Sequence, residues 1–512
     1  MANNKVTDAD ALGFHMEPTP GKFEITATVP MTTQRDLSLA YSPGVAVPCL
    51  AIADNPELAY DYTNKGNLVA VISNGTAVLG LGNLGALGSK PVMEGKAVLF
   101  KRFADVNSVD IELDTEDPQD FINAVKLMGP TFGGINLEDI KAPECFIIEQ
   151  ALKELMDIPV FHDDQHGTAV ICAAGLINAL YLSGKLIQDV KIVLNGAGAA
   201  GIACIELLKS MGAKHNNCVL CDTKGVIYQG RAEGMNQWKS AHAINTDFRT
   251  LNEVMVGADV FLGVSVKGAV TPEMVASMAP NPVIFAMANP DPEITPEDAH
   301  EVRPDAIVAT GRSDYPNQVN NVLGFPYLFR GALDIHARAI NDEMKISCAR
   351  ALADLAREEV PNEVTLAYGT KLSFGRDYII PTPFDPRLIY RIPPAVARAG
   401  MNTGVARRPI VDMDGYELSL KTRMDPTASI LRGINARARS AQARMIFSEG
   451  HDERVLRAAV MYQRQGFGKS IVVGREGEVR ARLEAAGLGD AVGELEIVNA
   501  AKTDNLGIYK DY

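Results

Sequence analysis

The stretch FHDDQHGTA, residues 161–169, carries the most obvious candidates for chemistry. A short apolar run ends in two adjacent acids, Asp163 and Asp164, and an apolar helical pattern then extends from Gly167 to Leu180. In open α/β sheets, ligands bind where a strand gives way to a helix. Acids at such a place can also do no more than cap the helix, and this stretch alone does not decide between the two interpretations.

A glycine motif forms a second candidate site. The residues GAGAAG, 196–201, follow a buried-strand pattern at Val190–Leu194 and open an apolar helix, and a further strand pattern ends at Asp222. Glycines permit the tight turn and the close approach of a pyrophosphate, which the helix N-terminus attracts. This context predicts a dinucleotide site whose contacts come from Gly196, Gly198, Ala199, Ala200 and Gly201.

The residues around Asp222 leave the choice of dinucleotide open. An acid at the end of the second strand favours a ribose 2′-hydroxyl and therefore NAD. Thr223, Lys224 and Lys239 could instead hold the 2′-phosphate of NADP.

Amide side chains follow two further strand patterns. Asn289 comes after Pro282–Met287, and Asn320 and Asn321 come after Ala306–Ala309. Asparagine clusters are usually turns. Because both clusters fall at strand ends beside a nucleotide site, we interpret them as candidate substrate contacts, with Asn289 also a candidate contact of the cofactor.

The elements that position these residues alternate between strand and helix, which predicts an α/β protein with a doubly wound sheet. Leu68–Ser73 and Thr76–Leu81 are predicted to form a hairpin through Asn74-Gly75. The glycine-rich passage that follows is expected to take an irregular path and to place Lys96 at the start of an apolar segment.

Helical patterns and composition divide the chain into three predicted domains, 1–160, 161–400 and 425–512. The first begins with a loosely structured arm, and the proline-rich stretch Pro381–Pro394 is interpreted as a connector at the edge of the second. The third opens with an arginine-rich helical passage at 430–444, and its few strand patterns suggest an incomplete α/β domain.

Charge and composition argue against several classes of protein. The 512 residues carry a formal net charge of −14, which disfavours nucleic acid as a partner. No signal-peptide pattern and no run of about 18 apolar residues occurs, so we expect a cytoplasmic protein without a membrane segment. Cys218 and Cys221 form a Cys-x-x-Cys, but they stand in a strand pattern without a second pair and are expected to pack in the core.

With these features in place, residues 18–400 resemble the malic enzymes. The matching motifs are YSPGVA, GLGNLGALGSKPVMEGKAVLFK, INLEDI, FHDDQHGTA, NGAGAAG, AMANP and NQVNNVLGFP. MIFSEGHDERVLRAA and IVVGR resemble the start of phosphate acetyltransferase domains, and the combination is similar to the large bacterial hybrid malic enzymes. The resemblance implies oxidative decarboxylation of malate to pyruvate and CO2 with NAD or NADP and Mg²⁺ or Mn²⁺.

The resemblance also implies a metal site. Glu138, Asp139 and Asp164 match the family's metal ligands, and hard carboxylate oxygens suit Mg²⁺ or Mn²⁺. His162 and His166 are the rival ligands, although imidazole suits zinc better. Asp163 would then orient the site or adjust the pKa of a neighbour.

The remaining roles that the resemblance implies are catalytic and substrate-binding. Lys96 matches the general base, whose pKa would have to be lowered by burial or by neighbouring cations, and Tyr41 matches the acid that protonates C3 of enolpyruvate. Asn289 and Asn321, with Asn320 close by, match the contacts of the substrate carboxylate. The arginine that longer relatives use on malate has no match before Leu68, so the group that neutralises the remote carboxylate stays open.

Cofactor choice and assembly also follow the resemblance. Relatives that use NADP have lysines near the positions of Lys224 and Lys239, which favours NADP over NAD. A homo-oligomer is expected, and in full-length relatives the terminal domain implies regulation by acetyl-CoA. Two alternatives remain: a 2-hydroxy-acid dehydrogenase that stops at the keto acid, and a regulatory protein that senses acetyl-CoA or acetyl phosphate.

Overall fold

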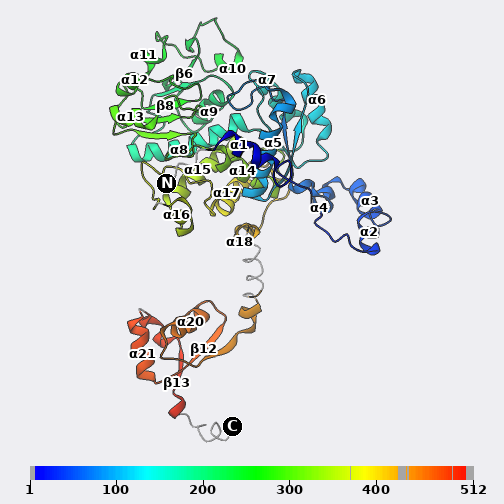
Figure 1. Ribbon diagram of the computed structural model, residues 1–512, viewed down its shortest axis with the longest axis vertical. Helices are drawn as coiled ribbons and strands as arrows, with labels where there is room; N and C mark the ends of the chain where they lie inside the picture. Colours follow the sequence, from blue (N-terminus) through cyan, green and yellow to red (C-terminus); the bar gives the residue numbers. More distant parts are fainter. Residues whose placement is uncertain (1–5, 370, 425–433, 435–436, 487, 503–512) are drawn as a thin grey trace. The chain divides into compact units, whose positions relative to one another are not determined.

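The structure is a computed structural model that describes residues 6–502 except 370, 425–433, 435–436 and 487. The chain divides into two compact units, Met1–Lys421 and Thr422–Tyr512, and each is described by itself. The first unit contains two sheets and the second contains one (Figure 1).

The first sheet has four parallel strands in the order β2-β1-β3-β4. Every residue of β1 is buried, as expected for a central strand that is covered on both faces. Three helices, α5 (Gly85–Ala104), α6 (Pro118–Met128) and α7 (Glu144–Leu155), make the crossovers. The strands are β1 (Leu68–Ser73), β2 (Asn107–Glu112), β3 (Gly134–Leu137) and β4 (Val160–His162).

The predicted hairpin at Asn74-Gly75 is wrong. Residues 76–81 form turns with one isolated bridge, Val78 to Gly82, instead of a strand. Because β2 and β3 occupy both edges of β1, no place is left for a hairpin partner. Asn74-Gly75 instead turns the chain towards α5, and the carbonyl of Gly75 accepts hydrogen bonds from the N–H groups of Leu84 and Gly85.

The glycine-rich passage is also more regular than predicted. From Gly85 onwards it forms α5, and Lys96 lies within this helix instead of at the start of a segment. The helix buries Met93, Ala97 and Phe100, so apolar residues at helical spacing outweigh the low helix propensity of the glycines.

The second sheet has the order β10-β9-β8-β5-β6-β7, in which only β7 runs antiparallel. This confirms the predicted doubly wound sheet with its reversal of strand order beside β5. Cys218 and Cys221 are buried in β6, as expected for core residues. The strands are β5 (Ile192–Asn195), β6 (Cys218–Asp222), β7 (Gly225–Val226), β8 (Val260–Gly263), β9 (Val283–Ala286) and β10 (Ile307–Thr310).

A buried apolar helix, α8 (Thr168–Ser183), links the two sheets. The segment Asp163–Ser183 is long and apolar enough to cross a membrane, but 72% of its apolar 18-residue window is buried inside the fold. It packs against α9 (Ala199–Ser210) and α15 (Asp342–Arg357), and the Asn178 side chain donates to the carbonyls of Ala353 and Ile379, each at 2.8 Å. These contacts are those of a core helix.

The proline-rich stretch is not a connector. Residues from Leu388 to Asn402 form α17, which includes Pro393 and Pro394 and packs against α14 (Phe325–Asp334) and α15. Gly331 permits this approach, because a Cβ at that position would lie 2.7 Å from the carbonyl oxygen of Pro393. The first unit therefore continues through α17 to Lys421.

Short helices complete the first unit. The expected loose arm contains the helix α1 (Asp8–Met16), whose N-terminus is capped by a capping box at Thr7. The N-terminus of α2 (Gln34–Ala40) has a similar capping box at Thr33. The others are α3 (Ala46–Asp54), α4 (Ala59–Tyr62), α10 (Gln237–Ser240), α11 (Leu251–Met255), α12 (Pro272–Ala276), α13 (Pro296–Val302), α16 (Asn362–Tyr368) and α18 (Met413–Arg423).

The second unit is a small three-stranded parallel sheet with helices. Its strands are β11 (Ala443–Phe447), β12 (Gly468–Val473) and β13 (Glu496–Val498), with β12 in the centre. The helices α20 (Glu453–Arg464) and α21 (Glu476–Ala485) bury Leu456 and Leu483 against Val472. The predicted helix 430–444 begins outside the described residues, and its last two residues belong to β11.

Candidate active site

Three carboxylates gather at the carboxyl ends of β3 and β4. Glu138 and Asp139 directly follow β3, and Asp164 follows β4, which pairs with β3. One ligand oxygen from each lies within 4.8 Å of the others. The N–H of Asp139 also donates to Oδ2 of Asp164 at 2.8 Å, which fixes the two loops against each other.

The electrostatics of this cluster fit a hard divalent cation. Burial and the neighbouring Asp164 raise the pKa of Asp139 to about 7, and burial also raises the pKa of Glu138 well above its ordinary value. Oδ2 of Asp139 is buried without a hydrogen-bond partner among the described residues. Mutually repelling, incompletely bonded carboxylate oxygens are the donor set that Mg²⁺ or Mn²⁺ would satisfy.

Neither rival histidine belongs to this group of ligands, although Nδ1 of His162 lies 3.6 Å from Oδ2 of Asp164. The metal-ligand group found in the described part of the chain consists of the three acids and includes neither histidine. His166 bonds to Glu149, with Nε2 at 2.9 Å from Oε1, and burial lowers the pKa of its ring to about 4. Glu149 also accepts from the N–H of His162 at 3.1 Å. This buried acid, which the sequence analysis missed, positions the FHDDQHGTA stretch.

Lys96 points from α5 into the acid cluster. Its Nζ lies 2.8 Å from Oε1 of Glu138, bonds to Oδ2 of Asp163, and sits 4.1 Å from the ring centroid of Phe325. Burial alone would lower the pKa of Lys96, but Asp163 and Glu138 outweigh it and hold the pKa above its ordinary range. The expected lowering of this pKa is therefore wrong, because the neighbouring carboxylates raise it.

Asp163 links the lysine to a candidate substrate contact. Its Oδ2 also accepts from Nδ2 of Asn321 at 3.1 Å, whereas its Oδ1 is buried without a hydrogen-bond partner among the described residues. Asn320 caps the turn before α14 by accepting from the N–H of Val322 at 3.0 Å. Asn289 is exposed after β9, and its backbone carbonyl lies against Gly80.

Tyr41 lies apart from these residues within the chain. It caps the C-terminal end of α2 and is 71% exposed, whereas the side chain of Lys96 is only 11% exposed. The helices α2 and α3 project from the body of the unit, away from α5 (Figure 1). The structure therefore brings together Lys96, Asp163, Asn321 and the three acids, but not Tyr41.

The glycine motif forms the predicted turn between β5 and α9. Gly196 has φ +117°, and a Cβ there would lie 2.4 Å from the carbonyl oxygen of Val264. A Cβ at Gly201 would lie 1.8 Å from the carbonyl oxygen of Gly196, so both positions exclude a side chain. Gly198 is the N-cap, and Ala199 and Ala200 begin the helix with backbone amides available for a phosphate.

Asp222 is neutralised by two cations. Its carboxylate accepts from Nη2 of Arg231 at 2.7 and 2.8 Å and from Nζ of Lys239 at 2.7 Å. Burial would raise the pKa of Asp222, but these two cations outweigh it and lower the pKa. Lys224 instead pairs with Glu233 at 2.8 Å, and Thr223 is exposed. The sequence analysis missed Arg231, which no motif marks.

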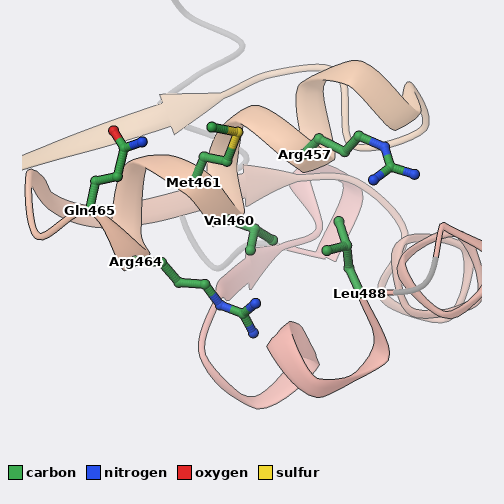
Figure 2. A pocket seen from close by; sticks show the side chains of 6 residues that line it. All are labelled: Arg457, Val460, Met461, Arg464, Gln465 and Leu488. Carbon is green, nitrogen blue, oxygen red and sulfur yellow. The ribbon is translucent and has the colours of Figure 1, made fainter. Parts of the chain in front are cut away.

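The second unit has a shallow groove along α20 (Figure 2). Val460, Met461 and Leu488 provide its apolar wall, with Gln465 at one end. Its two arginines are already paired, Arg457 with Glu453 at 2.7 Å and Arg464 with Glu494 at 3.1 Å. The groove is therefore an apolar surface between two ion pairs.

Three sequence families match the chain. The family described as "Malic enzyme, N-terminal domain" matches residues 20–119, "Malic enzyme, NAD binding domain" matches 165–368, and "Phosphate acetyl/butaryl transferase" matches 429–511. The three matched ranges follow one another along the chain in the same order as the three sheets: the first and second sheets of the first unit, then the sheet of the second unit.

Relatives and solved structures agree with these matches. The chain is 62% identical to an NADP-dependent malic enzyme of Rhizobium meliloti (strain 1021), over 100% of the chain and 67% of that relative. An NADP-dependent malic enzyme of Halomonas elongata is 60% identical over 79% of the chain and 96% of its own length. The malic enzyme structure from Pyrococcus horikoshii Ot3 superposes with a TM-score of 0.76 at 41% identity, covering 84% of this chain and 98% of that chain. This chain therefore belongs to the malic enzyme family.

Proposed function

We propose that this chain catalyses the oxidative decarboxylation of (S)-malate to pyruvate and CO2, with NADP as the oxidant and Mg²⁺ or Mn²⁺ as the metal. The observation that carries the proposal is the contact between Lys96 and the acid cluster Glu138, Asp139 and Asp164. It joins a candidate proton acceptor to a candidate site for a hard cation.

The reaction divides into three transfers. A hydride leaves C2 of malate for the nicotinamide while the C2 hydroxyl proton passes to a base. The resulting keto acid loses a carboxylate as CO2, and the electrons of that bond form an enolate whose C3 is then protonated. A divalent cation held by the three carboxylates would supply Lewis acidity at the C2 oxygen and offset negative charge beside Lys96.

The chain's own residues would hold and move the protons. Lys96 would accept the C2 hydroxyl proton, and Asp163 keeps its Nζ at the edge of the acid cluster. Asn321, hydrogen-bonded to the same Asp163, would orient a substrate carboxylate together with Asn289, while Asn320 shapes the intervening turn. Tyr41 would return a proton to C3.

The ion pairs of Asp222 favour NADP over NAD. An unpaired acid here would accept from the ribose 2′-hydroxyl of NAD and would repel a 2′-phosphate. Arg231 and Lys239 offset that charge through their hydrogen bonds to Asp222, and Lys239 would also contact the phosphate. Thr223 and Lys224 would border the same position.

The decisive experiment is an assay of malate-dependent NADP reduction, with and without Mg²⁺ or Mn²⁺, in which CO2 is measured in parallel. We expect equal amounts of NADPH and CO2, and activity only with the metal. NADPH without CO2 would indicate the alternative 2-hydroxy-acid dehydrogenase. Full activity after metal chelation would contradict the proposal.

A further inference from the structure

A buried carboxylate lies among the strand ends of the second sheet. Glu293 belongs to the loop between β9 and α13, and it is 0% exposed. Its Oε1 accepts hydrogen bonds from the N–H of Ser265 at 2.7 Å and from Oγ of the same serine at 2.9 Å. Its Oε2 accepts from the N–H of Ala288 at 3.0 Å. One side chain therefore bonds to the loops that follow β8 and β9.

The same network reaches the end of β5. Asn195 is the last residue of β5, and its Nδ2 donates to Oγ of Ser265 at 2.9 Å. Because a hydroxyl donates one proton and accepts at its lone pairs, Ser265 can donate to Glu293 while it accepts from Asn195. The strands β9, β8 and β5 are neighbours in the sheet. Glu293 and Ser265 therefore connect three adjacent strand ends.

The end of β8 is shaped to admit this carboxylate. Gly263 is the last residue of β8, and a Cβ there would lie 2.4 Å from Cδ of Glu293. Hydrogen bonds hold both oxygens of that carboxylate, so it cannot move aside as a free side-chain end would. The close approach of Glu293 therefore requires a residue without a side chain at this position.

The hydrogen bonds of Glu293 require an acid and not only a side chain of this size. Its three donors are two backbone N–H groups and a hydroxyl, none of which is a cation. A buried carboxylate is costly unless hydrogen bonds satisfy it, and it accepts at both oxygens. A glutamine of equal size would direct its own N–H groups towards one of the two backbone N–H groups and would lose that contact.

The strand ends that Glu293 connects carry separate parts of the proposed site. Asn195 directly precedes Gly196, at which the turn for the pyrophosphate begins. Ala288 directly precedes Asn289, the proposed contact of substrate and cofactor. Asn289 also touches the passage that leads into α5, because a Cβ at Gly80 would lie 2.9 Å from its carbonyl oxygen. Ligands of an open α/β sheet bind along this edge.

We propose that Glu293 is a positioning residue for hydride transfer, whose carboxylate sets the separation between the pyrophosphate turn and Asn289 and so aligns the nicotinamide with C2 of malate. The reaction in which it would act rests on the proposed function, whereas the connection of the loops rests on the hydrogen bonds. Reacting atoms have to approach to about 3–3.5 Å, and a displacement of about 1 Å can lower the rate by about 100-fold. Glu293 would act through the two loops and not by touching the substrate.

Ligand binding to Glu293→Gln tests the positioning role without turnover. Adenosine 2′,5′-bisphosphate contains the adenosine half of NADPH but no nicotinamide, so it does not depend on the Asn289 loop. We expect the dissociation constant of NADPH to rise about tenfold, while that of the bisphosphate stays within about twofold of the parent value. Isothermal titration calorimetry measures both constants. An equal change for the two ligands, including no change, would overturn the proposal, because a loss of folded protein weakens both alike.

The first turnover provides a second readout. With enzyme in excess of malate and with saturating NADP and Mg²⁺, stopped-flow absorbance gives both the rate constant and the amplitude of NADPH formation. We expect Glu293→Gln to lower the rate constant by about 10- to 100-fold. A merely structural role would lower the amplitude and leave the rate constant at the parent value, and that result contradicts the proposal.

Two further variants and the parent complete the test. Glu301→Gln, the same substitution on an exposed glutamate of α13, should leave both dissociation constants and the rate constant unchanged. Should Glu293→Gln fail to fold, Ser265→Ala removes only the link to Asn195 and should show the same preferential loss of NADPH affinity at smaller size; without it the proposal fails.

The parent separates the two possible failures. A parent that does not reduce NADP with malate contradicts the proposed function. An active parent whose Glu293→Gln variant keeps the parent rate constant contradicts the positioning role alone.

Discussion

At the scale of single residues, the three carboxylates of the acid cluster repel one another, and a bound cation would offset this repulsion. The folded chain raises the pKa of Asp139 to about 7, above the value of a free aspartate, so the folded state binds protons more tightly than the unfolded state. The stabilising effect of that proton is present at acidic pH and is lost as the pH rises through about 7.

The raised pKa of Asp139 leads to a prediction about metal binding. Mg²⁺ competes with protons for the three carboxylates, so we expect it to raise the melting temperature more at pH 8 than at pH 5.5. Differential scanning calorimetry at both pH values, with and without Mg²⁺, measures the effect. Asp164→Asn should remove most of the gain at pH 8, and an equal gain in this variant would place the metal elsewhere.

A second prediction concerns the cations around Asp222. Lys239→Ala removes the 2.7 Å contact and leaves part of the acid's charge uncompensated, which should repel the 2′-phosphate. We expect kcat/KM for NADP to fall by about 10-fold, in line with the loss of one hydrogen bond to a charged group, while that for NAD changes little.

The matched control for that variant is Lys224→Ala, because Lys224 is bonded to Glu233 instead of to Asp222. This variant should change the ratio of kcat/KM for NADP to kcat/KM for NAD less than Lys239→Ala does. If the two variants changed the ratio equally, the ion pair of Lys239 with Asp222 would not be the determinant.

At the scale of elements, the structure shows what local patterns can and cannot specify. The strand, glycine turn and helix from Val190 onwards were predictable because one short segment contains the whole signal. Asn74-Gly75 also carried a strong local signal, but the partner of β1 is decided by β2 and β3, which lie far away in sequence. The parallel pairing of the fully buried strand β1 therefore outweighed the local turn preference of Asn74-Gly75.

Long-range packing also explains the residues that were missed. Pro393 and Pro394 predict a break, yet α17 forms because its apolar face is buried against α14 and α15. Arg231 and Glu149 belong to no motif, and their roles depend on neighbours that only the fold brings together. The metal acids could be assigned from the family resemblance, whereas the separation of Tyr41 from them could not.

The close approach of α14 and α17 can be tested directly. Gly331→Val would place side-chain atoms against the carbonyl of Pro393 and the side chain of Val396, so we expect a loss of about 1–3 kcal/mol of unfolding free energy from overpacking. Gly13→Ala, in a helix with nothing within 4 Å of the added Cβ, serves as the control and should not destabilise the protein. Urea denaturation curves of both variants measure the difference.

At the scale of the whole molecule, the C-terminal unit is the candidate for regulation. It matches the phosphate acetyltransferase family, but the arginines of its groove are already paired with Glu453 and Glu494. A ligand with phosphate groups would have to break these ion pairs before it could use either guanidinium. We therefore expect saturating acetyl-CoA to change malate turnover of this 512-residue chain weakly or not at all, and strong inhibition would contradict this expectation.

The location of all proposed site residues in the first unit leads to a final prediction. Every residue proposed for metal, substrate or cofactor binding lies between Tyr41 and Asn321, within the unit that ends at Lys421. The Halomonas elongata relative matches 79% of this chain over 96% of its own length, so a chain of about the first unit's size is found in the family. Because the first unit has its own buried sheets and helices, removal of residues 424–512 should leave kcat with malate and NADP within about threefold of the parent. Steady-state kinetics and circular dichroism of the shortened chain provide the test, and a folded but inactive first unit would show that the C-terminal unit takes part in catalysis.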